Sequence, residues 1–228
     1  MAEEKRVITV RRTHRRVEPN LIAAVRDAHG GFIVDAIGRE GALDHRIKPI
    51  TSKTSFSGSA LTVQCRPWDN LAAHVALEHI QPGDVLAISA RGFEGASVIG
   101  EKLIGMAKNK GAVAVVVDGM ARDSAGIDSV GIPVFTRGIT ANSSHKDGPG
   151  TVGLPISLGG VSVSSGDLLV GDADGVVCVP SWQFDLLVAR LSAIVTTEHA
   201  MFQQIMEGGA KPTKMAAVAM DAEIRYVD

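Results

Sequence analysis

The part of the chain that most constrains its fold is an acidic residue, a helix-like run, an apolar run and an Arg-Asp pair, in that order. Glu101 follows a glycine and opens the helix-like residues 101–110, residues 113–117 are apolar and strand-like, and Arg122-Asp123 comes after them. A helix followed by a strand brings the chain back to the edge from which it started, so we expect Glu101, Arg122 and Asp123 to face one pocket. Two carboxylates and one guanidinium suit a divalent cation and an anionic substrate.

Each of these features also has a purely structural interpretation. Asp123 could cap a helix beside a surface arginine, and Glu101 could be a carboxylate favoured by the helix dipole. Residues 92–100 are expected to form a glycine-spaced loop, either as a plain strand-to-helix turn or as a site where backbone N–H groups bind a carboxylate or phosphate. This loop matches neither GxGxxG nor the P-loop pattern. The three charged residues together favour a site more strongly than any of them alone.

Composition limits the classes of protein to consider. The chain has 228 residues, of which 45% are hydrophobic and only 4% aromatic, so the core must be built from aliphatic side chains. A net charge of −2 gives no global field that favours nucleic acid, and we expect no nucleic-acid partner. No stretch approaches the roughly 20 apolar residues of a membrane span, and no apolar signal core begins the chain. Cys65 and Cys178 lie in apolar contexts without zinc spacing, which predicts buried thiols in a reducing cytoplasm.

Residues 1–19 are locally basic, whereas the rest of the chain is mixed in charge. Runs of this kind are often solvated or partner-facing arms, so we predict an arm at 1–19 and a single α/β domain at 20–228. The arginines of the arm are Arg6, Arg11, Arg12, Arg15 and Arg16.

The order of the predicted elements indicates a layered α/β domain with mixed sheets and flanking helices, rather than a TIM barrel. Helices and parallel-type strands come first, and short strands follow a long polar loop at 136–153 that we expect to be functional. Helices are predicted at 21–28, where Gly30-Gly31 would stop the helix, at 67–79 and, as a long C-terminal helix, at 181–207; residues 34–38 are a second helix or a turn. Strands are predicted at 60–65, 85–89, 113–117, 132–135, 154–158, 161–163, 167–170 and 175–179.

Glu198 falls on the apolar stripe of the long C-terminal helix. A carboxylate there either reaches the rim of the helix or pairs with a charged site, because a buried and unpaired carboxylate is costly. The histidines do not form a metal cluster, since His74 and His79 are five residues apart on one helix and point in different directions.

Four sequence motifs lie within residues 20–209: Gly100-Glu101-x-Leu103, Asp118-Gly-x-x-Arg122-Asp123, Gly131-x-Pro133-Val134-Phe135 and Gly171-Asp-Ala-Asp-Gly-Val176. Together they resemble the RraA-like superfamily, which includes the 4-hydroxy-4-methyl-2-oxoglutarate aldolases, also called class II pyruvate aldolases. The resemblance implies a swivelling-type β/β/α domain that assembles as a homotrimer or hexamer, with the site at a subunit interface.

The resemblance also implies roles for individual residues. Asp123 would bind Mg²⁺ or Mn²⁺, and Glu101 would hold a water molecule on that ion. Backbone N–H groups of Lys102 and Leu103 would bind the carboxylate of the substrate, and Arg122 would bridge the reacting oxygens. Glu198 is the candidate for a catalytic glutamate that a neighbouring subunit contributes.

The expected activity is a metal-dependent lyase that cleaves small 4-hydroxy-2-oxo dicarboxylic acids to pyruvate, with related decarboxylation of oxaloacetate. One departure from the family pattern favours an alternative. Active aldolases of this group usually carry Asp or Glu where this chain has Gly126, and the non-catalytic regulators of ribonuclease E also lack that acid. The alternative is therefore a non-catalytic regulator that binds a ribonuclease or helicase. A methyltransferase acting on a quinone is disfavoured, since no glycine-rich nucleotide loop is present.

Overall fold

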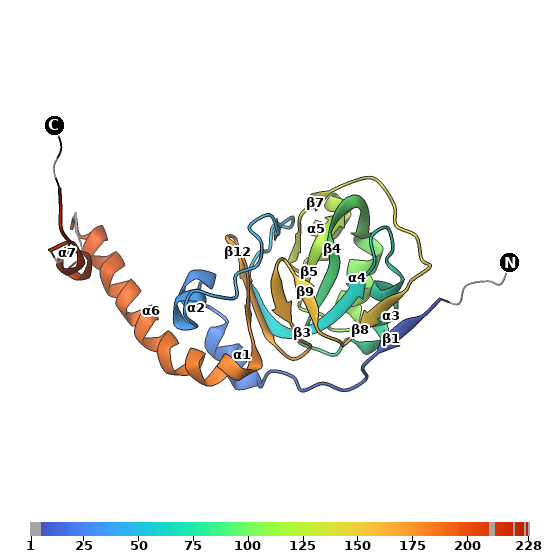
Figure 1. The fold of residues 1–228 in the computed structure, drawn as a ribbon, viewed down its shortest axis with the longest axis horizontal. Coiled ribbons are helices and arrows are strands. Elements are labelled where there is room, and N and C mark those ends of the chain that lie inside the picture. Colours follow the sequence, from blue (N-terminus) through green and yellow to red (C-terminus); the bar gives the residue numbers. More distant parts are fainter. Residues whose placement is uncertain (1–5, 210–212, 221, 226, 228) are drawn as a thin grey trace.

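The computed structural model describes residues 6–209, 213–220, 222–225 and 227, and a large mixed sheet dominates it (Figure 1). Four strands lie side by side in parallel in the order β3-β4-β5-β6. Strands β3, β4 and β5 are rich in buried Val, Ile, Leu and Ala, and the short β6 is buried throughout, as expected for strands covered on both faces. Their bounds are Phe56–Cys65 (β3), Asp84–Ile99 (β4), Ala114–Ala121 (β5) and Val134–Thr136 (β6).

Further strands extend this parallel centre, β1 and β7 through parallel pairings and the others through antiparallel ones. Strand β8 pairs with β3 and, on its other side, with β1, while a hairpin of β11 and β12 also joins β3. Strands β2 and β7 add short pairings to β6 and β5, and β9 and β10 form a separate two-stranded sheet. The bounds are Ile8–Val10 (β1), Lys48–Pro49 (β2), Gly138–Ile139 (β7), Gly150–Val152 (β8), Ile156–Leu158 (β9), Val161–Val163 (β10), Leu168–Asp172 (β11) and Gly175–Val179 (β12).

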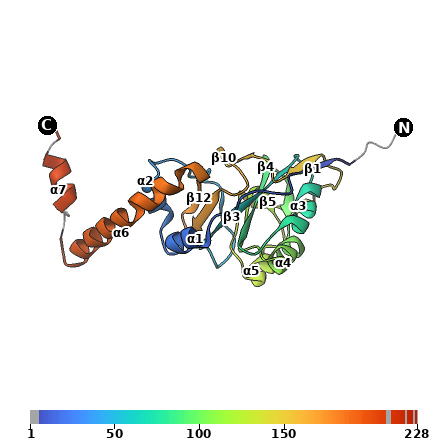
Figure 2. The ribbon, with the colours of Figure 1, turned by 90° about the horizontal axis from the view of Figure 1, so that it is seen from below.

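Three apolar cores lie between the layers of secondary structure, and Figure 2 shows how those layers are arranged. One lies between the sheet and the helices α3, α4 and α5, and a second lies on the opposite face of the sheet, under β9 and β10. The third is formed where α1, α2 and the first half of α6 cover β11 and β12. The helices are α1 (Pro19–Val25), α2 (Gly30–Ala36), α3 (Leu71–Ala76), α4 (Glu101–Asn109), α5 (Ser124–Val130), α6 (Phe184–Met206) and α7 (Thr213–Met220), with 3₁₀ turns at Leu77–His79 and Ser181–Gln183.

The mixed α/β fold with a long C-terminal helix is confirmed, and two local predictions are wrong. Residues 92–100 are not a loop, because β4 continues to Ile99 through register shifts against β5. Gly30 does not stop the first helix but opens α2, where its N–H donates to Asp172 Oδ2 at 2.8 Å. In both places a contact from elsewhere in the chain overrides the local glycine signal.

Residues of the predicted N-terminal arm run along the domain. Strand β1 pairs with β8, and Val17 is buried. Arg16 binds the fully buried carboxylate of Asp84 through two hydrogen bonds of 2.8 and 3.0 Å. This part of the chain is therefore attached to the sheet, while the division into an arm at 1–19 and a domain at 20–228 stays a prediction.

Helix α6 covers the domain only along its first half. Leu187 and Leu191 are buried, whereas Phe202, Ile205 and Met206 are at least half exposed. The second half projects away from the body, on the side opposite α4 and α5 (Figure 1). Within the described ranges, no helix combines the length and the apolar character that a membrane crossing needs.

Candidate functional site

A cavity of about 440 Å³ lies where α4 and α5 begin. It is in the size range typical of small-molecule sites. Strand β4, the turn after β5, helix α3 and the loop before β8 also line it. Its residues are Asn70, His74, Ser97, Ile99, Gly100, Glu101, Lys102, Leu103, Arg122, Asp123, Ser143, Ser144 and Lys146. The predicted convergence of Glu101, Arg122 and Asp123 on one pocket is thus observed.

The pairing of β4 with β5 sets this convergence. Ile99 lies opposite Ala121, and the N–H of Arg122 donates to Ile99 O at 3.1 Å. The two strands therefore end together, and each passes into a helix at the same edge. Gly100 allows the close approach, since a Cβ at that position would lie only 2.7 Å from Asp123 Oδ2.

Asp123 has a strained backbone, and its carboxylate makes no capping hydrogen bond. Its φ of 61° and ψ of 43° place it in the left-handed region, which is uncommon for residues other than glycine and often marks functional sites. It occupies the N-cap position of α5, yet its side chain makes no capping hydrogen bond. The helix-capping interpretation is therefore wrong, and the carboxylate, about half exposed, faces the cavity beside Arg122.

Arg122 is held by its neighbours on both sides. Its Nε lies 3.5 Å from Asp123 Oδ2, and its Nη1 donates to Ser143 Oγ. Ser143 belongs to the long polar segment that was expected to be functional, and that segment is attached to β4: Ser97 Oγ donates to Asn142 O at 2.7 Å, and Ser144 Oγ donates to Ser97 O at 2.8 Å. The guanidinium is thereby placed over the cavity.

The start of α4 offers an anion site in the same cavity. Gly100 is its N-cap and supplies no side chain to cap it, and the first intrahelical bond is that of Ile104 N to Gly100 O. The N–H groups of Lys102 and Leu103 precede that bond and have no intrahelical acceptor. Both residues line the cavity, so their N–H groups and the helix dipole favour a carboxylate there.

The side chain of Glu101 packs against Gly126 in α5. A Cβ on residue 126 would overlap Glu101 Oε2 and would lie 2.8 and 2.9 Å from Glu101 Cδ and Cβ. The missing side chain at position 126 therefore provides the space that the Glu101 side chain fills. An acidic residue at 126 and this conformation of Glu101 exclude one another.

The donor set fits a hard divalent cation. Asp123 and Glu101 supply two carboxylates to one cavity, and the part of the chain that the structure describes holds no group of three or more His, Cys, Asp or Glu residues able to bind a metal. Mg²⁺ commonly binds through one or two carboxylates, with substrate and water completing its shell. Asp123 and Glu101 are thus the residues that would hold such an ion.

Sequence reasoning missed His74 and Lys146, which both line the cavity. The pKa of His74 is lowered by burial and, to a lesser degree, by the charge of Lys146. The sequence signals were the spacing of Asn70 and His74, which are four residues apart, and the place of Lys146 in the long polar segment 136–153.

Two other predicted features lie elsewhere. Glu198 lines a shallow pocket with Asp35, Arg39 and Lys214, away from α4 and α5. Asp118 is buried within β5 on the opposite face of the sheet, where Arg137 pairs with it and with Asp44. Asp118 is therefore part of a structural ion-pair network.

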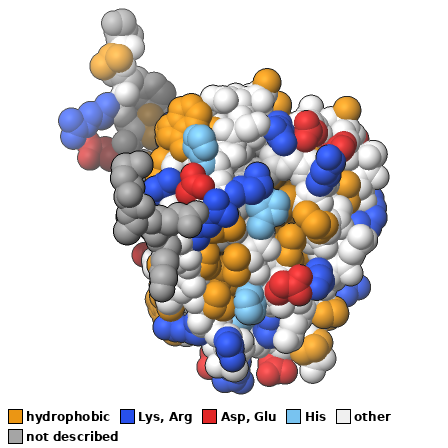
Figure 3. Space-filling view, turned by 90° about the vertical axis from the view of Figure 1, so that its right-hand side faces the viewer, with side chains coloured by type: hydrophobic (Ala, Val, Ile, Leu, Met, Phe, Trp, Pro, Cys, Tyr) orange, Lys and Arg blue, Asp and Glu red, His pale blue; other side chains and the backbone are white. Residues whose placement is uncertain are grey.

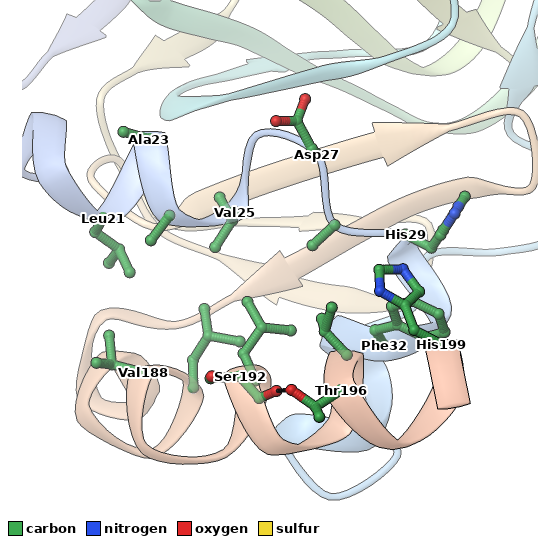
Figure 4. A pocket seen from close by; sticks show the side chains of 15 residues that line it. Leu21, Ala23, Val25, Asp27, His29, Phe32, Val188, Ser192, Thr196 and His199 are labelled. Atoms are coloured by element: carbon green, nitrogen blue, oxygen red, sulfur yellow. Dashed lines mark hydrogen bonds between the residues drawn. The ribbon is translucent and has the colours of Figure 1, made fainter. Parts of the chain in front are cut away.

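A second cavity, of about 450 Å³, lies between α1, α2 and α6 (Figure 4). It is lined mainly by aliphatic side chains, with the rings of His29 and Phe32 in edge contact 5.2 Å apart. His29 and His199 lie at one end of this cavity beside Phe32, whereas the carboxylate of Asp27 points away from the other lining side chains (Figure 4). This cavity lacks the converging charges of the first.

The charged side chains on the α3 and β1 side are dispersed. Figure 3 shows basic, acidic, histidine and hydrophobic side chains interspersed over the described part of this face. This arrangement differs from the continuous basic stripe that marks a nucleic-acid interface.

Comparisons with known proteins agree with the geometry. The model of the RraA-like family, described as Aldolase/RraA, matches residues 22–178. The chain is 42% identical over 151 residues to the "Putative 4-hydroxy-4-methyl-2-oxoglutarate aldolase" of Halalkalibacterium halodurans, which covers 66% of this chain and 72% of that protein.

Two solved structures have a similar fold. One is the RNA-processing inhibitor RraA from Thermus thermophilis, with a TM-score of 0.62 and 30% identity over 68% of this chain and 93% of that chain. The other is RraAS2 of Streptomyces coelicolor, described as an unusual member of the RNase ES inhibitor RraA protein family, with a TM-score of 0.72 and 27% identity over 84% of this chain and 100% of that chain.

Proposed function

The chain belongs to the RraA-like family, and from that premise we propose that it is a divalent-metal-dependent lyase. Its substrates are small 4-hydroxy-2-oxo dicarboxylic acids, which it cleaves to pyruvate, and it also decarboxylates oxaloacetate. The observation that carries this proposal is the meeting of Asp123, Arg122 and the uncapped start of α4 in one cavity. That cavity has a place for a cation, for a developing negative charge and for a carboxylate.

Different residues of this chain bind the substrate carboxylate and the metal ion. The N–H groups of Lys102 and Leu103 hold the carboxylate next to the 2-oxo group, which fixes the substrate across the cavity. Asp123 and Glu101 hold Mg²⁺ or Mn²⁺. Such an ion, when bound, acts as a Lewis acid toward the 2-oxo acid.

Bond cleavage moves negative charge toward the cationic side of the site. As the C3–C4 bond breaks, its electron pair passes to C3 and the 2-oxo oxygen, and the 4-hydroxyl group loses its proton to become a carbonyl. Arg122 stabilises the charge where it develops. A carboxylate of Glu101, with Glu198 from a second copy, accepts the hydroxyl proton through water. Protonation of C3 then gives pyruvate.

We further propose that the site is completed by a second copy in a homotrimer or hexamer. In the described residues, Glu198 lies on the side of the molecule away from Asp123, so it cannot reach the cavity of its own chain. The projecting half of α6 exposes Phe202 and Met206, as a helix that packs on another subunit would.

The test is a coupled pyruvate-release assay over a panel of 2-oxo acids, with and without Mg²⁺. Removal of the metal by EDTA should abolish turnover, and Mg²⁺ should restore it. Arg122→Ala should lower kcat about 10²- to 10³-fold, as loss of other charged contacts to a developing oxyanion does. The exposed Arg26→Ala variant is the matched control and should keep full activity. Full oxaloacetate decarboxylation by Arg122→Ala, or by the EDTA-treated protein, would refute the mechanism.

The second candidate is a non-catalytic regulator of a ribonuclease or helicase. It is supported by Gly126, which replaces the acid usual in active aldolases of this group, and by the likeness to RraA inhibitors. Affinity capture from a lysate distinguishes the two. Measurable pyruvate release without capture of a nuclease or helicase rejects the regulator.

A further inference from the structure

Two residues that line the cavity, His74 and Lys146, have no part in the proposed mechanism. Helix α3 contributes His74, and the loop before β8 contributes Lys146. Neither residue takes part in metal binding, in holding the first carboxylate or in charge stabilisation at the 2-oxo oxygen.

The backbone on both sides of Lys146 is fixed. His145 N donates to Trp68 O at 2.7 Å, and His145 O accepts from Asn70 N at 3.0 Å. On the other side, the buried carboxylate of Asp69 accepts from the N–H groups of Asp147 at 2.6 Å and Gly148 at 3.0 Å. The loop that carries Lys146 is therefore anchored to the start of α3, and the lysine is held at the cavity.

Lys146 is also an unpaired cation. Among the described residues, no carboxylate lies within ion-pair distance of its ammonium group, whereas Arg122, another cation that lines the cavity, lies beside Asp123. An ammonium group held at a small-molecule cavity without a counter-ion is suited to an anionic group of the ligand.

His74 complements this cation without adding a second charge. It lies on the last turn of α3 and is half-buried, and burial together with the charge of Lys146 lowers its pKa. The imidazole is therefore neutral at neutral pH and has one N–H to donate. One ammonium group and one neutral N–H donor match the two oxygens of a carboxylate.

We propose that Lys146 and His74 bind the second carboxylate of the substrate, so that the cavity selects 2-oxo acids with a carboxylate at both ends. This inference rests on the proposed lyase function and adds to it the residues that determine its specificity. The first carboxylate lies at the start of α4, the reacting atoms lie near Arg122, and the distal carboxylate lies between α3 and the anchored loop.

Two acids that differ only at the distal group test the proposal. 4-Hydroxy-4-methyl-2-oxoglutarate yields two molecules of pyruvate, and 4-hydroxy-4-methyl-2-oxopentanoate, in which a methyl group replaces the distal carboxylate, yields pyruvate and acetone. Lys146→Met should lower kcat/KM for the first acid about 10- to 100-fold, as loss of a charge-assisted hydrogen bond does, and leave that for the second within about 2-fold. His74→Asn should show a smaller loss with the same selectivity, and Lys146→Arg should recover part of the activity.

Lys53→Met, an exposed lysine outside the cavity, is the matched control and should leave both rates unchanged. Equal losses on both acids, or no loss on either, would overturn the subsite and leave the lyase intact. Calorimetric binding of 2-oxoglutarate and 2-oxopentanoate, which are not cleaved, separates the two claims. A protein that cleaves neither hydroxy acid but binds 2-oxoglutarate more tightly through Lys146 would refute the lyase and retain the subsite.

Discussion

Gly126→Ala is the substitution that most directly tests the packing of Glu101. Gly126 is the third residue of α5 and has no positive φ, so alanine suits its backbone conformation. Alanine is about 1 kcal/mol more favourable than glycine inside a helix. That gain is opposed here, because the new Cβ would overlap Glu101 Oε2 and lie 2.9 Å from Glu101 Cβ.

The helix α4 supplies a matched control in Gly105. A Cβ at that position would meet no atom within 4 Å, so Gly105→Ala would benefit from the higher helix propensity of alanine without any steric cost. It should be about 1 kcal/mol more stable than the parent protein. Overpacking costs about 1–3 kcal/mol, so Gly126→Ala should range from unchanged to about 2 kcal/mol less stable. For a chain of this size, each kcal/mol corresponds to about 2–4 °C in Tm.

Thermal unfolding and pyruvate release should be measured on both variants. We expect Gly105→Ala to have a higher Tm than the parent protein and full activity. Gly126→Ala should have a Tm no higher than that of the parent and a kcat/KM about 10-fold lower, because the new Cβ moves the Glu101 carboxylate out of its pre-organised position. If Gly126→Ala is stabilised as much as Gly105→Ala and keeps its activity, then Glu101 neither packs on Gly126 nor serves the site.

Three further predictions concern Asp123, Arg16 and Cys65. Asp123→Asn should lower kcat more than about 100-fold and weaken the response to Mg²⁺, which a metal titration checks. It should change the free energy of unfolding, measured by urea unfolding, by less than about 0.5 kcal/mol, because asparagine tolerates the left-handed backbone and no capping bond is lost. Arg16→Met leaves the buried carboxylate of Asp84 without its partner and should lower the free energy of unfolding by about 3–5 kcal/mol, which urea unfolding measures; a loss under 1 kcal/mol would contradict the burial of this pair. Burial raises the pKa of the Cys65 thiol to about 12, so the thiol stays neutral at pH 8 and iodoacetamide should label it only after unfolding; rapid labelling of the folded protein would contradict this.

Local signals in the sequence were sufficient for the elements that place Glu101, Arg122 and Asp123 in the candidate site. Glu101 after a glycine marks the start of α4, and the apolar run after it becomes β5. Because helix and strand are consecutive and β5 pairs with β4, the sequence order alone brings Glu101 close to Arg122 and Asp123.

The elements that were predicted wrongly depend on contacts between distant parts of the chain. The glycines of residues 92–100 favoured a loop, but β5 provides a partner along which β4 continues with register shifts. Gly30 looked like a helix stop, but Asp172, 142 residues further on, accepts its N–H at the start of α2. No local pattern encodes such partners.

The distal end of the cavity was hidden for the same reason. His74 and Lys146 are far apart in sequence, and they meet because Asp69 and His145 form a bridge that joins the loop to the start of α3. In the sequence, neither residue alone indicates a binding site. Only the anchored loop makes them a pair.

The place of Glu198 can be decided by mixing two inactive subunits. If Glu198 completes the cavity of a neighbour, Asp123→Asn and Glu198→Gln each inactivate a different half of the shared site. In an equimolar co-expressed oligomer with random assembly, about one interface in four combines an intact Asp123 with an intact Glu198, so about a quarter of the parental activity should return. A site contained in one chain cannot be restored in this way, because every subunit carries one of the two defects. Absence of any recovery in mixed oligomers, verified by differently tagged subunits, would therefore place the remaining catalytic carboxylate within the same chain and leave the projecting half of α6 without a role in the reaction.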